Sequence, residues 1–243
     1  MANYAVTDLH GMKDLWLQIK NYCKPDDKIY FLGDAADRGP DGVEIILDLL
    51  KDERVTYLKG NHEDMLVMVI KQVLNRDFRN LSWWQDNGGA VTCLDVLSLK
   101  LEEQKELLEK LDNLPDHMVI SNAKGQNIFL SHAGTALDYD NYELYFIKGE
   151  PYLWDRRHFR KPWPKSESYS NWYIVHGHTP CQILSKELNE IEQFYDKVIN
   201  YPENEIISYA DGHKFDLDLA SFASNRIALF NLDELKVEKY FEL

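Results

Sequence analysis

Asp-Leu-His-Gly at residues 8–11, Gly-Asp-Ala-Ala-Asp-Arg-Gly at 33–39 and Gly-Asn-His-Glu at 60–63 carry most of the information in this chain. Each block follows a short apolar run typical of a β-strand, and each leads into a segment with helical periodicity. The expected strands are Tyr4–Thr7, Lys28–Leu32 and Arg54–Leu58, and the expected helices are Gly11–Tyr22, Pro40–Lys51 and Asn61–Leu74. This alternation predicts an α/β fold with a largely parallel sheet.

The three blocks place polar side chains at the ends of these strands. Ligand sites in open α/β sheets lie at the carboxyl ends of strands, so we expect the blocks to meet there. Asp8 and His10 would share one face of an extended strand before the chain turns at Gly11. Two carboxylates and an arginine are crowded between the glycines of residues 33–39, and the carboxylates repel each other unless a cation lies between them. The sequence therefore predicts a cation site at this edge.

Six side chains have the chemistry and the position of metal ligands. They are Asp8, His10, Asp34, Asn61, His132 in Ser131-His132-Ala133-Gly134, and His178 in Gly177-His178-Thr179-Pro180. The carboxylate of Asp34 can bridge two ions, and the set suits a pair of divalent ions about 3.5–4 Å apart. Imidazole combined with oxygen ligands favours manganese, iron or zinc over magnesium or calcium.

The rest of the chain predicts additional helices and strands within one domain over residues 1–243. Residues 78–113 are expected to form an amphipathic helical insert over the sheet, interrupted at Asn87-Gly88-Gly89. The further expected strands are His117–Ser121, Asn127–Leu130 and Tyr173–Val175, with an antiparallel tail of Ile206–Ala210, Phe215–Leu219, Arg226–Asn231 and Lys236–Phe241. Residues 135–171 resemble an irregular active-site loop region. Residues 186–214 match the family poorly and are either a β-excursion near the site or a surface elaboration.

The composition limits where this chain acts and what it binds. A net charge of −14 over 243 residues argues against nucleic-acid or anionic-membrane binding, which needs a basic face. The first residues lack the basic and apolar regions of a signal peptide, and no apolar run is long enough for a membrane span. Three widely spaced cysteines without a Cys-x-x-Cys pair predict buried thiols in a reducing compartment. We therefore expect a cytoplasmic protein.

The quoted residues resemble the phosphoprotein phosphatases within the calcineurin-like metallophosphoesterases. The pattern of that family is Gly-Asp-x-His-Gly, Gly-Asp-x-x-Asp-Arg-Gly and Gly-Asn-His-Glu, followed by two later histidines. Trp84-x-x-Asn87-Gly88-Gly89 and Leu153-Trp154-Asp155-Arg156 are similar to the bacterial and phage branch, which is like lambda phosphatase. The resemblance implies a β-sandwich flanked by helices, with the active site at the carboxyl ends of strands.

The resemblance also implies a role for each matched residue. Asp8, His10 and Asp34 would hold the first metal ion, and Asp34, Asn61, His132 and His178 the second. His62 would be the general acid, oriented by Asp37, while Arg38 and Arg156 would clamp phosphate oxygens. Hydrolysis would then proceed by direct attack of a hydroxide that bridges the two ions, which are expected to be manganese, with iron and zinc as alternatives.

A few positions depart from the family pattern or have two interpretations. Thr7 stands where the family has glycine, and His176 precedes the Gly-His element where many relatives are apolar. Glu63 is expected to support the site rather than to react. Three tryptophans could line a substrate groove or only pack the loops, namely Trp154, Trp163 and Trp172. His117, His158 and His213 match no motif and are expected to be ordinary polar residues.

Three functions are compatible with these residues. The first is a metal-dependent serine/threonine protein phosphatase that acts on a phosphorylated protein or peptide. The second is a hydrolase of dinucleoside polyphosphates such as diadenosine tetraphosphate, which would act on a nucleotide and would need a pocket for the base. The third is a non-catalytic scaffold, which would be expected to lack ligands or the acid. Because all of these residues are present, the sequence favours the enzyme and leans towards the protein phosphatase.

Overall fold

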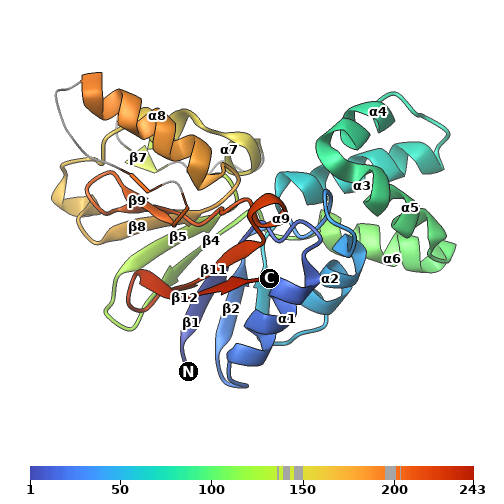
Figure 1. The fold of residues 1–243 in the computed structure, drawn as a ribbon, viewed down its shortest axis with the longest axis horizontal. Coiled ribbons are helices and arrows are strands. Elements are labelled where there is room, and N and C mark those ends of the chain that lie inside the picture. The colour runs from blue at the N-terminus through green and yellow to red at the C-terminus, as the bar shows by residue number, and fades with distance from the viewer. Residues whose placement is uncertain (136, 139–142, 145–149, 195–200, 203) are drawn as a thin grey trace.

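The structure of the chain is a computed structural model that describes residues 1–135, 137–138, 143–144, 150–194, 201–202 and 204–243. Parts of the predicted loop region 135–171 and of the stretch 186–214 therefore lie outside the described residues. Within the described residues, two five-stranded sheets face each other, and helices cover their outer faces (Figure 1). This arrangement is the expected β-sandwich flanked by helices.

The first sheet contains the three strands that precede the signature blocks. Its order is β12-β11-β1-β2-β3, with bounds Lys236–Glu242, Arg226–Asn231, Asn3–Val6, Lys28–Phe31 and Val55–Tyr57. β1, β2 and β3 are parallel, because each is followed by a helix that returns the chain to the same end of the sheet. β11 is antiparallel to β1, and β12 is antiparallel to β11.

The second sheet is built from the later strands. Its order is β4-β5-β8-β10-β9, with bounds His117–Ser121, Asn127–Ser131, Trp172–His176, Lys214–Asp216 and Ile207–Tyr209. β5, β8 and β10 are parallel, whereas β4 and β9 are antiparallel edge strands. A short ribbon pairs β6 (Leu137–Asp138) with β7 (Glu143–Leu144).

Alternation along the strands separates two hydrophobic cores. In β2, Ile29 and Phe31 point towards the helices, while Tyr30 joins the layer between the two sheets. The layer between the sheets is completed from the second sheet by residues such as Leu130, Val175 and Phe215. Because alternate residues face two different buried layers, both faces of these strands are apolar. The strands are therefore nearly continuous apolar runs in the sequence.

The helices form two groups on opposite sides of the sandwich. The first group comprises α1 (Lys13–Tyr22), α2 (Gly42–Leu49) and an arm of α3 (Asn61–Leu74), α4 (Leu81–Trp84), α5 (Ala90–Ser98) and α6 (Leu101–Asp112). The second sheet carries α7 (Glu150–Trp154) and α8 (Cys181–Phe194), and α9 (Ser221–Ser224) precedes β11 (Figure 1). Among the described residues, no helix has the length and apolar character that crossing a membrane requires.

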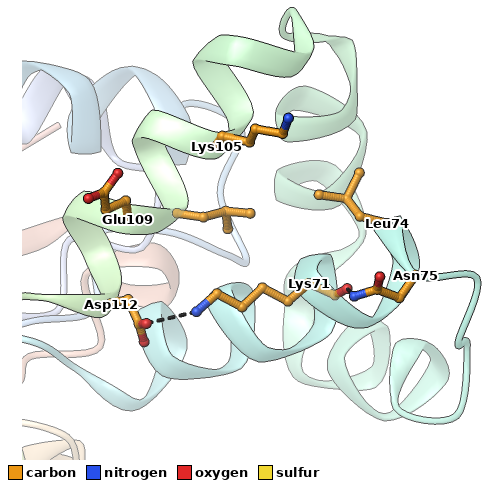
Figure 2. A pocket seen from close by; sticks show the side chains of 7 residues that line it. Lys71, Leu74, Asn75, Lys105, Glu109 and Asp112 are labelled. Carbon is orange, nitrogen blue, oxygen red and sulfur yellow. Dashed lines mark hydrogen bonds and ion pairs between the residues drawn. The ribbon is translucent and has the colours of Figure 1, made fainter.

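The predicted insert, residues 78–113, forms α4, α5 and α6 of this arm. Its α4 and α5 are separated by a kink at Gln85–Gly89, where Gly88 has a φ of 98°. A hollow of about 290 Å³ lies between α3 and α6, lined by Lys71, Leu74, Asn75, Lys105, Leu108, Glu109 and Asp112 (Figure 2). An ion pair of 2.7 Å between Lys71 and Asp112 crosses it. None of the candidate site residues lines this hollow.

The structure refines two predictions about the sheets. The three strands before the signature blocks are parallel as expected, but the sheet that they form is mixed, because β11 and β12 add to it in antiparallel fashion. The tail strands pair antiparallel as expected, β9 with β10 and β11 with β12, but they are divided between the two sheets. Short apolar strands that are buried on both faces carry little information about which neighbour each strand pairs with. The prediction of one domain over residues 1–243 stays a prediction.

Candidate metal centre

Loops after five strands of the two sheets converge on one buried cluster. Asp8 and His10 follow β1, Asp34 follows β2, and Asn61 begins α3 directly after β3. The second sheet contributes His132 after β5 and His178 after β8. All six side chains are buried, with at most 9% exposed, so the cluster lies below the surface where charge is poorly screened.

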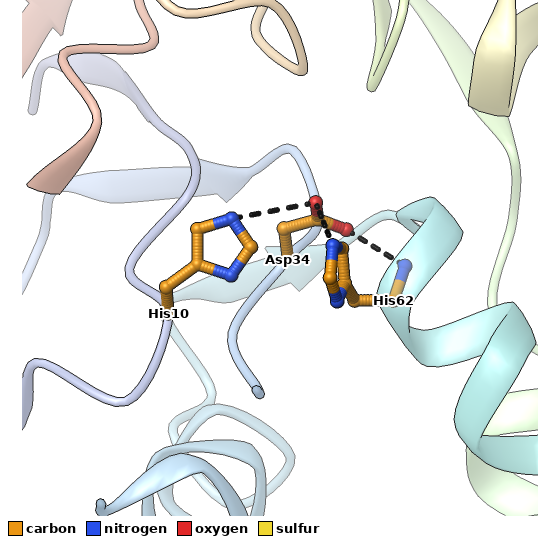
Figure 3. A group of neighbouring side chains, drawn as sticks. All are labelled: His10, Asp34 and His62. Atoms are coloured by element: carbon orange, nitrogen blue, oxygen red, sulfur yellow. Dashed lines mark hydrogen bonds and ion pairs between the residues drawn. The ribbon is translucent and has the colours of Figure 1, made fainter. Parts of the chain in front are cut away.

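The carboxylate of Asp34 is the centre of this cluster. Its Oδ1 accepts a hydrogen bond from the backbone N–H of His62 at 3.0 Å. Its Oδ2 lies 3.7 Å from Nε2 of His10 and 3.8 Å from Nε2 of His62, so that the carboxylate faces both rings (Figure 3). Nε2 of His132 is closer, at 3.3 Å. One carboxylate is therefore in reach of ligand atoms from both sheets.

On one side of Asp34, nitrogen and oxygen atoms converge on the amide of Asn61. Nε2 of His132 lies 2.8 Å from Oδ1 of Asn61, and Nδ1 of His178 lies 2.9 Å from the same oxygen. Nδ1 of His132 lies 2.9 Å from the carbonyl of Leu32 and donates to it, which leaves Nε2 with a lone pair. The ligand atoms of Asp34, His132 and His178 all lie within 4.8 Å of one another.

On the other side of Asp34, His10 faces Asp8. Nδ1 of His10 donates to the carbonyl of Ala36 at 2.9 Å, so Nε2 is the nitrogen that carries the lone pair. This Nε2 lies 3.7 Å from Oδ1 of Asp8. Oδ2 of Asp8 accepts from the hydroxyl of Thr7 at 2.6 Å and from the N–H of His178 at 3.1 Å. Thr7, which departs from the family pattern, thus orients a candidate ligand.

The candidate ligands offer the donor atoms that divalent cations require. Oδ1 of Asp8 is buried and has no hydrogen-bond partner. Nε2 of His132 and Nδ1 of His178 both face Oδ1 of Asn61, so two imidazole nitrogens and an amide oxygen converge on one point. Imidazole nitrogens with carboxylate and amide oxygens are ligands that manganese, iron and zinc accept.

The electrostatics of the cluster also call for positive charge. Burial and the carboxylate of Asp218 raise the pKa of Asp8 well above its usual range. Burial disfavours the ionised form of Asp34, but His132 and His62 hold its pKa well below the usual range. Burial lowers the pKa of His132, yet Asp34 and Asp8 outweigh burial and raise it to about 9. A buried group of acids therefore stabilises whatever cation lies among them.

The candidate general acid lies beside this cluster with its own carboxylate. Nδ1 of His62 is 2.7 Å from Oδ2 of Asp37, which leaves Nε2 directed towards Asp34. The same Oδ2 accepts a hydrogen bond from the indole Nε1 of Trp84 at 2.7 Å. The backbone N–H of Asp37 donates to the hydroxyl of Thr92 at 3.0 Å. The helical arm therefore fixes the carboxylate that orients His62.

Both candidate phosphate-binding arginines are exposed at the cluster. Nη1 of Arg38 lies 2.8 Å from Nε2 of His10, and Nη2 lies 3.3 Å from Nε2 of His62. The backbone N–H of Arg38 donates to the carbonyl of Gly88 at 2.9 Å. Arg156 donates from Nε to the hydroxyl of Thr179 at 3.0 Å, next to His178. Each guanidinium keeps further donors for an anion.

Glu63 supports the loops rather than facing the cluster. Its carboxylate accepts from the N–H groups of Asp34, Ala35 and Gly60, each at 2.8 Å, and from the hydroxyl of Tyr57 at 2.9 Å. A side chain at Gly60 would collide with Oδ1 of Asp34, so the close approach of the two loops requires glycine there. The expectation that Glu63 supports the site agrees with these contacts.

The backbone is strained at the positions that supply the side chains. Six of them have positive φ angles, a conformation that costs about 1–3 kcal/mol for residues other than glycine. They are Asp8 (54°), His10 (44°), Asp34 (62°), Asp37 (68°), Arg38 (66°) and His178 (71°). Half of the twelve described non-glycine residues with positive φ therefore lie at the cluster, and the other half lie elsewhere in the chain.

Some residues that support the site were missed or left undecided from the sequence. Trp84 was noted only for its resemblance, and Thr92 carries no signal. His158, expected to be an ordinary polar residue, is fully buried, and its Nε2 donates to the carbonyl of Ala133, beside His132, at 2.9 Å. The hydroxyl of Tyr209 lies 3.2 Å from Nδ1 of His158 and links this histidine to the second sheet.

His176 also belongs to this supporting layer. Its Nε2 lies 2.8 Å from the hydroxyl of Tyr209, and burial lowers its pKa to about 3. Its backbone carbonyl accepts from the N–H of Leu217 at 2.9 Å. Asp216 lies opposite it on β10, and Asp218 follows. The Asp-Leu-Asp alternation at 216–218 is the signal that could have placed both carboxylates on one face.

The structure shows what each of the remaining undecided tryptophans and histidines packs against. Trp163 and Trp172 pack with Phe129 and Ile174 on the outer face of the second sheet. Trp154 instead lies against His178, with ring centroids 5.9 Å apart. His117 and His213 stack on aromatic rings, those of Phe129 and Trp163 respectively. Of the three tryptophans, only Trp154 contacts a candidate ligand.

Comparisons with known proteins add the family context. The model of a family described as calcineurin-like phosphoesterase matches residues 4–217. A bis(5'-nucleosyl)-tetraphosphatase PrpE [asymmetrical] from Oceanobacillus iheyensis is 28% identical over 242 residues, covering 86% of this chain and 92% of that protein. The protein of the same name from Bacillus subtilis is 26% identical and covers 75% and 80%, respectively.

Solved structures show the same fold at low sequence identity. A protein serine/threonine phosphatase from Saccharomyces cerevisiae similar to human PP5 superposes with a TM-score of 0.60 at 14% identity, covering 100% of this chain and 80% of that one. A metallophosphoesterase from Sphaerobacter thermophilus gives a TM-score of 0.51 at 16% identity, with 100% and 88% covered.

The relatives overturn the leaning towards a serine/threonine protein phosphatase. The two curated relatives are both named for tetraphosphatase activity on a bis-nucleosyl compound, and each aligns over three quarters or more of the chain. The physical reason for the wrong expectation is that the signature residues hold cations and a phosphate group. A phosphate monoester and a phosphate anhydride present that same group, so the signature does not distinguish them.

Proposed function

Because this chain belongs to the calcineurin-like phosphoesterase family, we propose that it is a hydrolase of dinucleoside polyphosphates such as diadenosine tetraphosphate, which it cleaves asymmetrically. The observation that carries this proposal is the relative named bis(5'-nucleosyl)-tetraphosphatase that aligns over 86% of the chain. The buried cluster around Asp34 supports it, because hydrolysis of a polyphosphate needs concentrated positive charge in an otherwise acidic protein.

In this proposal Asp34 would contribute to the binding of two divalent ions of the kind that the family uses. Asp8, His10 and Asp34 would hold one ion, and Asp34, Asn61, His132 and His178 would hold the other. Two such ions supply charge that neutralises phosphate oxygens and lowers the pKa of water. We propose manganese for both positions, with iron and zinc as the alternatives that the mixed imidazole and oxygen ligands allow.

The residues around the ions bind and orient the polyphosphate. Arg38 and Arg156 each present planar N–H donors that match two oxygens of one phosphate group. Hydrolysis joins a water oxygen to phosphorus and breaks the bond from that phosphorus to the bridging oxygen. The bridging oxygen leaves with the departing nucleotide, and we assign His62 to protonate it from Nε2. Asp37 keeps the ring oriented through its contact with Nδ1.

Product analysis with two substrates tests the proposal. The purified protein is supplied with manganese and given diadenosine tetraphosphate or a phosphoserine peptide, and kcat/KM is measured for each. We expect the dinucleotide to be preferred, with ATP and AMP as the products. Formation of two ADP molecules from each substrate molecule would contradict asymmetric cleavage. Turnover of the peptide without turnover of the dinucleotide would contradict the proposed substrate class.

A further inference from the structure

Two tryptophan side chains from distant parts of the chain face each other beside the candidate metal centre. Trp83 lies in α4 of the helical arm, and Trp154 ends α7 over the second sheet. Their ring centroids are 6.4 Å apart, and their planes are inclined by 32°. Trp83 is 41% exposed, and Trp154 is partly buried, with its side chain packed against the hydrophobic core on the helical side of the first sheet. We call these two rings the tryptophan pair.

The tryptophan pair is fixed to the site at both of its ends. The ring of Trp154 meets the ring of His178 edge to face, with centroids 5.9 Å apart and planes inclined by 81°. On the other side, the residue after Trp83 is Trp84, whose buried indole donates to Asp37 at 2.7 Å. Trp154 therefore contacts a residue that we assign to ion binding, and Trp83 is the sequence neighbour of the residue that holds Asp37.

Electrostatics next to the pair suit a ligand with a flat apolar part and an anionic part. Arg156 lies two residues after Trp154 and is exposed, with one guanidinium nitrogen bound to Thr179. Arg38 is exposed at the other side of the cluster. A phosphate held between the arginines would therefore carry any attached base towards aromatic surface rather than into water.

Packing alone does not account for an exposed indole at this position. Large aromatic rings contribute to stability mainly through the area that they bury, and the neighbouring Trp84 shows what a structural tryptophan of this helix does, because it is fully buried. Exposed aromatic faces near a phosphate site are typical of stacking platforms, on which any base can be placed because every base has a π-face.

We propose that the tryptophan pair is a stacking platform for one nucleobase of the substrate, and that it selects nucleoside polyphosphates over simple phosphates. This proposal rests on the proposed function, since it names the part of the dinucleotide that binds outside the cations. Purines are the preferred bases, because stacking strength grows with the area of the ring system.

An inhibition experiment isolates the contribution of the base. AMP and ribose 5-phosphate share the 5'-phosphate and the ribose and differ in the base. Their inhibition constants are measured against hydrolysis of p-nitrophenyl phosphate by the manganese-loaded protein. For the unaltered protein, we expect AMP to bind about 10- to 100-fold more tightly than ribose 5-phosphate. The ratio of the two constants removes any effect of a variant on the reporter reaction.

Three variants test whether Trp83 makes this difference. Trp83→Leu is expected to bring the ratio close to one, and Trp83→Tyr to keep most of it. Phe78→Leu is the matched control, because it removes another exposed aromatic ring from the same arm, 58% exposed, and it should keep the full ratio. An unchanged ratio in Trp83→Leu would overturn the platform, as would an unaltered protein that does not distinguish the two inhibitors.

The outcomes for the platform and for the proposed function can be told apart. Failure of the platform leaves turnover of diadenosine tetraphosphate by the unaltered protein intact, whereas failure of the proposed function abolishes this turnover whatever the inhibition ratio is. If the platform exists, Trp83→Leu also raises the KM for diadenosine tetraphosphate about 10- to 100-fold, with kcat changed less. An equal loss in kcat would instead indicate a structural defect of the arm.

Discussion

A proton donor matters most when the leaving group is a strong base, and His62 provides a test of this at the scale of one residue. General acid catalysis contributes about 10²- to 10⁴-fold for poor leaving groups. We expect His62→Asn to lower kcat by such a factor on an alkyl phosphate. The loss on p-nitrophenyl phosphate should be much smaller, because nitrophenolate departs without a proton. The measurement is kcat for both esters with the same manganese-loaded preparations.

The position of His62 near Asp34 makes an alternative outcome informative. Its Nε2 lies 3.8 Å from Oδ2 of Asp34, and the ligand atoms of His10, Asp34 and His62 form a second close group. If His62→Asn lowered kcat equally on both esters and also lowered the metal content of the protein, His62 would be a metal ligand instead of the general acid. Unchanged metal content with a selective loss on the alkyl ester is the expected result.

Lys214 is a buried cation whose titration should appear in the pH dependence of stability. It is fully buried on β10, where Nζ donates to the carbonyl of His158 at 2.8 Å, and burial lowers its pKa from 10.5 to about 7. Between these values the unfolded chain binds a proton that the folded chain does not. The free energy of unfolding should therefore rise with pH from about 7 to 10, by up to about 1.4 kcal/mol per pH unit.

Replacement of this lysine by methionine separates its titration from that of other groups. Lys214→Met keeps the aliphatic length and removes the charge, so the rise between pH 7 and 10 should become flatter. Urea unfolding at several pH values provides the measurement, with Lys165→Met, an exposed lysine, as the control. If the two variants showed parallel curves, the lowered pKa of Lys214 would be wrong.

At the scale of elements, the helical arm acts as a support for the catalytic loop. The indole of Trp84 donates to the carboxylate of Asp37, and the hydroxyl of Thr92 accepts from the backbone N–H of Asp37. The carbonyl of Gly88 accepts from the backbone N–H of Arg38. Trp84→Phe keeps most of the ring volume and removes the hydrogen bond to a buried carboxylate. We expect a loss of about 1.5–3 kcal/mol in the free energy of unfolding and a lower kcat, because Asp37 then holds His62 less firmly.

A second tryptophan in this chain is a matched control for Trp84. Trp16 in α1 is 1% exposed and also donates from Nε1 to a carboxylate, that of Asp48, at 2.7 Å. Trp16→Phe should lower stability by a similar amount without lowering kcat. Equal kcat losses in the two variants would mean that general destabilisation, and not the support of Asp37, explains the effect of Trp84→Phe.

Element by element, the sequence predicted the first half of the fold better than the second. The strands before the signature blocks and the helices after them are predicted because one periodicity changes to another at a glycine. The pairing of β10 between β8 and β9 could not be predicted, since it depends on contacts between segments far apart in the chain. The kink at Gly88 could be predicted only as an interruption of the helices. Its close packing against Arg38 could not be predicted, because Arg38 lies in a distant segment of the chain.

At the scale of the whole molecule, ions bound between the two sheets should stabilise the fold. A ligand that binds only the folded state contributes about 2.7 kcal/mol when present at a hundred times its dissociation constant. Removal of metal with a chelator is therefore expected to lower the melting temperature and abolish activity, and manganese should restore both. Differential scanning calorimetry and metal analysis of the same samples provide the measurement.

The proposed assignment of Asp34 to both ions provides a variant that tests this prediction. Asp34→Asn should abolish activity, reduce the metal content and make the melting temperature insensitive to manganese. Asp14→Asn removes an exposed carboxylate of α1 and should behave like the unaltered protein. Full metal content and retained activity in Asp34→Asn would contradict the assignment of Asp34 to both ions.

Most of the candidate site, but not its substrate, could be proposed from the sequence. Asp8, Asp34 and Asn61 stand in local patterns that only a cation site explains, and the structure brings them together with His132 and His178. The supporting residues Trp84 and His158 could not be assigned, because their partners come from other elements. Substrate choice also escaped the motifs, which describe the phosphate and not the group attached to it.

The candidate ligands are divided between the two halves of the polypeptide. Asp8, His10, Asp34 and Asn61 come from the first sheet, whereas His132 and His178 come from the second, and the exposed turn at Ala123–Lys124 separates the two sets. β11 and β12 from the later half complete the first sheet beside β1. Two fragments made by opening the chain at that turn would each carry an incomplete ligand set. Phosphate release would then report reassociation of the fragments, so this chain is suited to use as a split reporter of protein proximity.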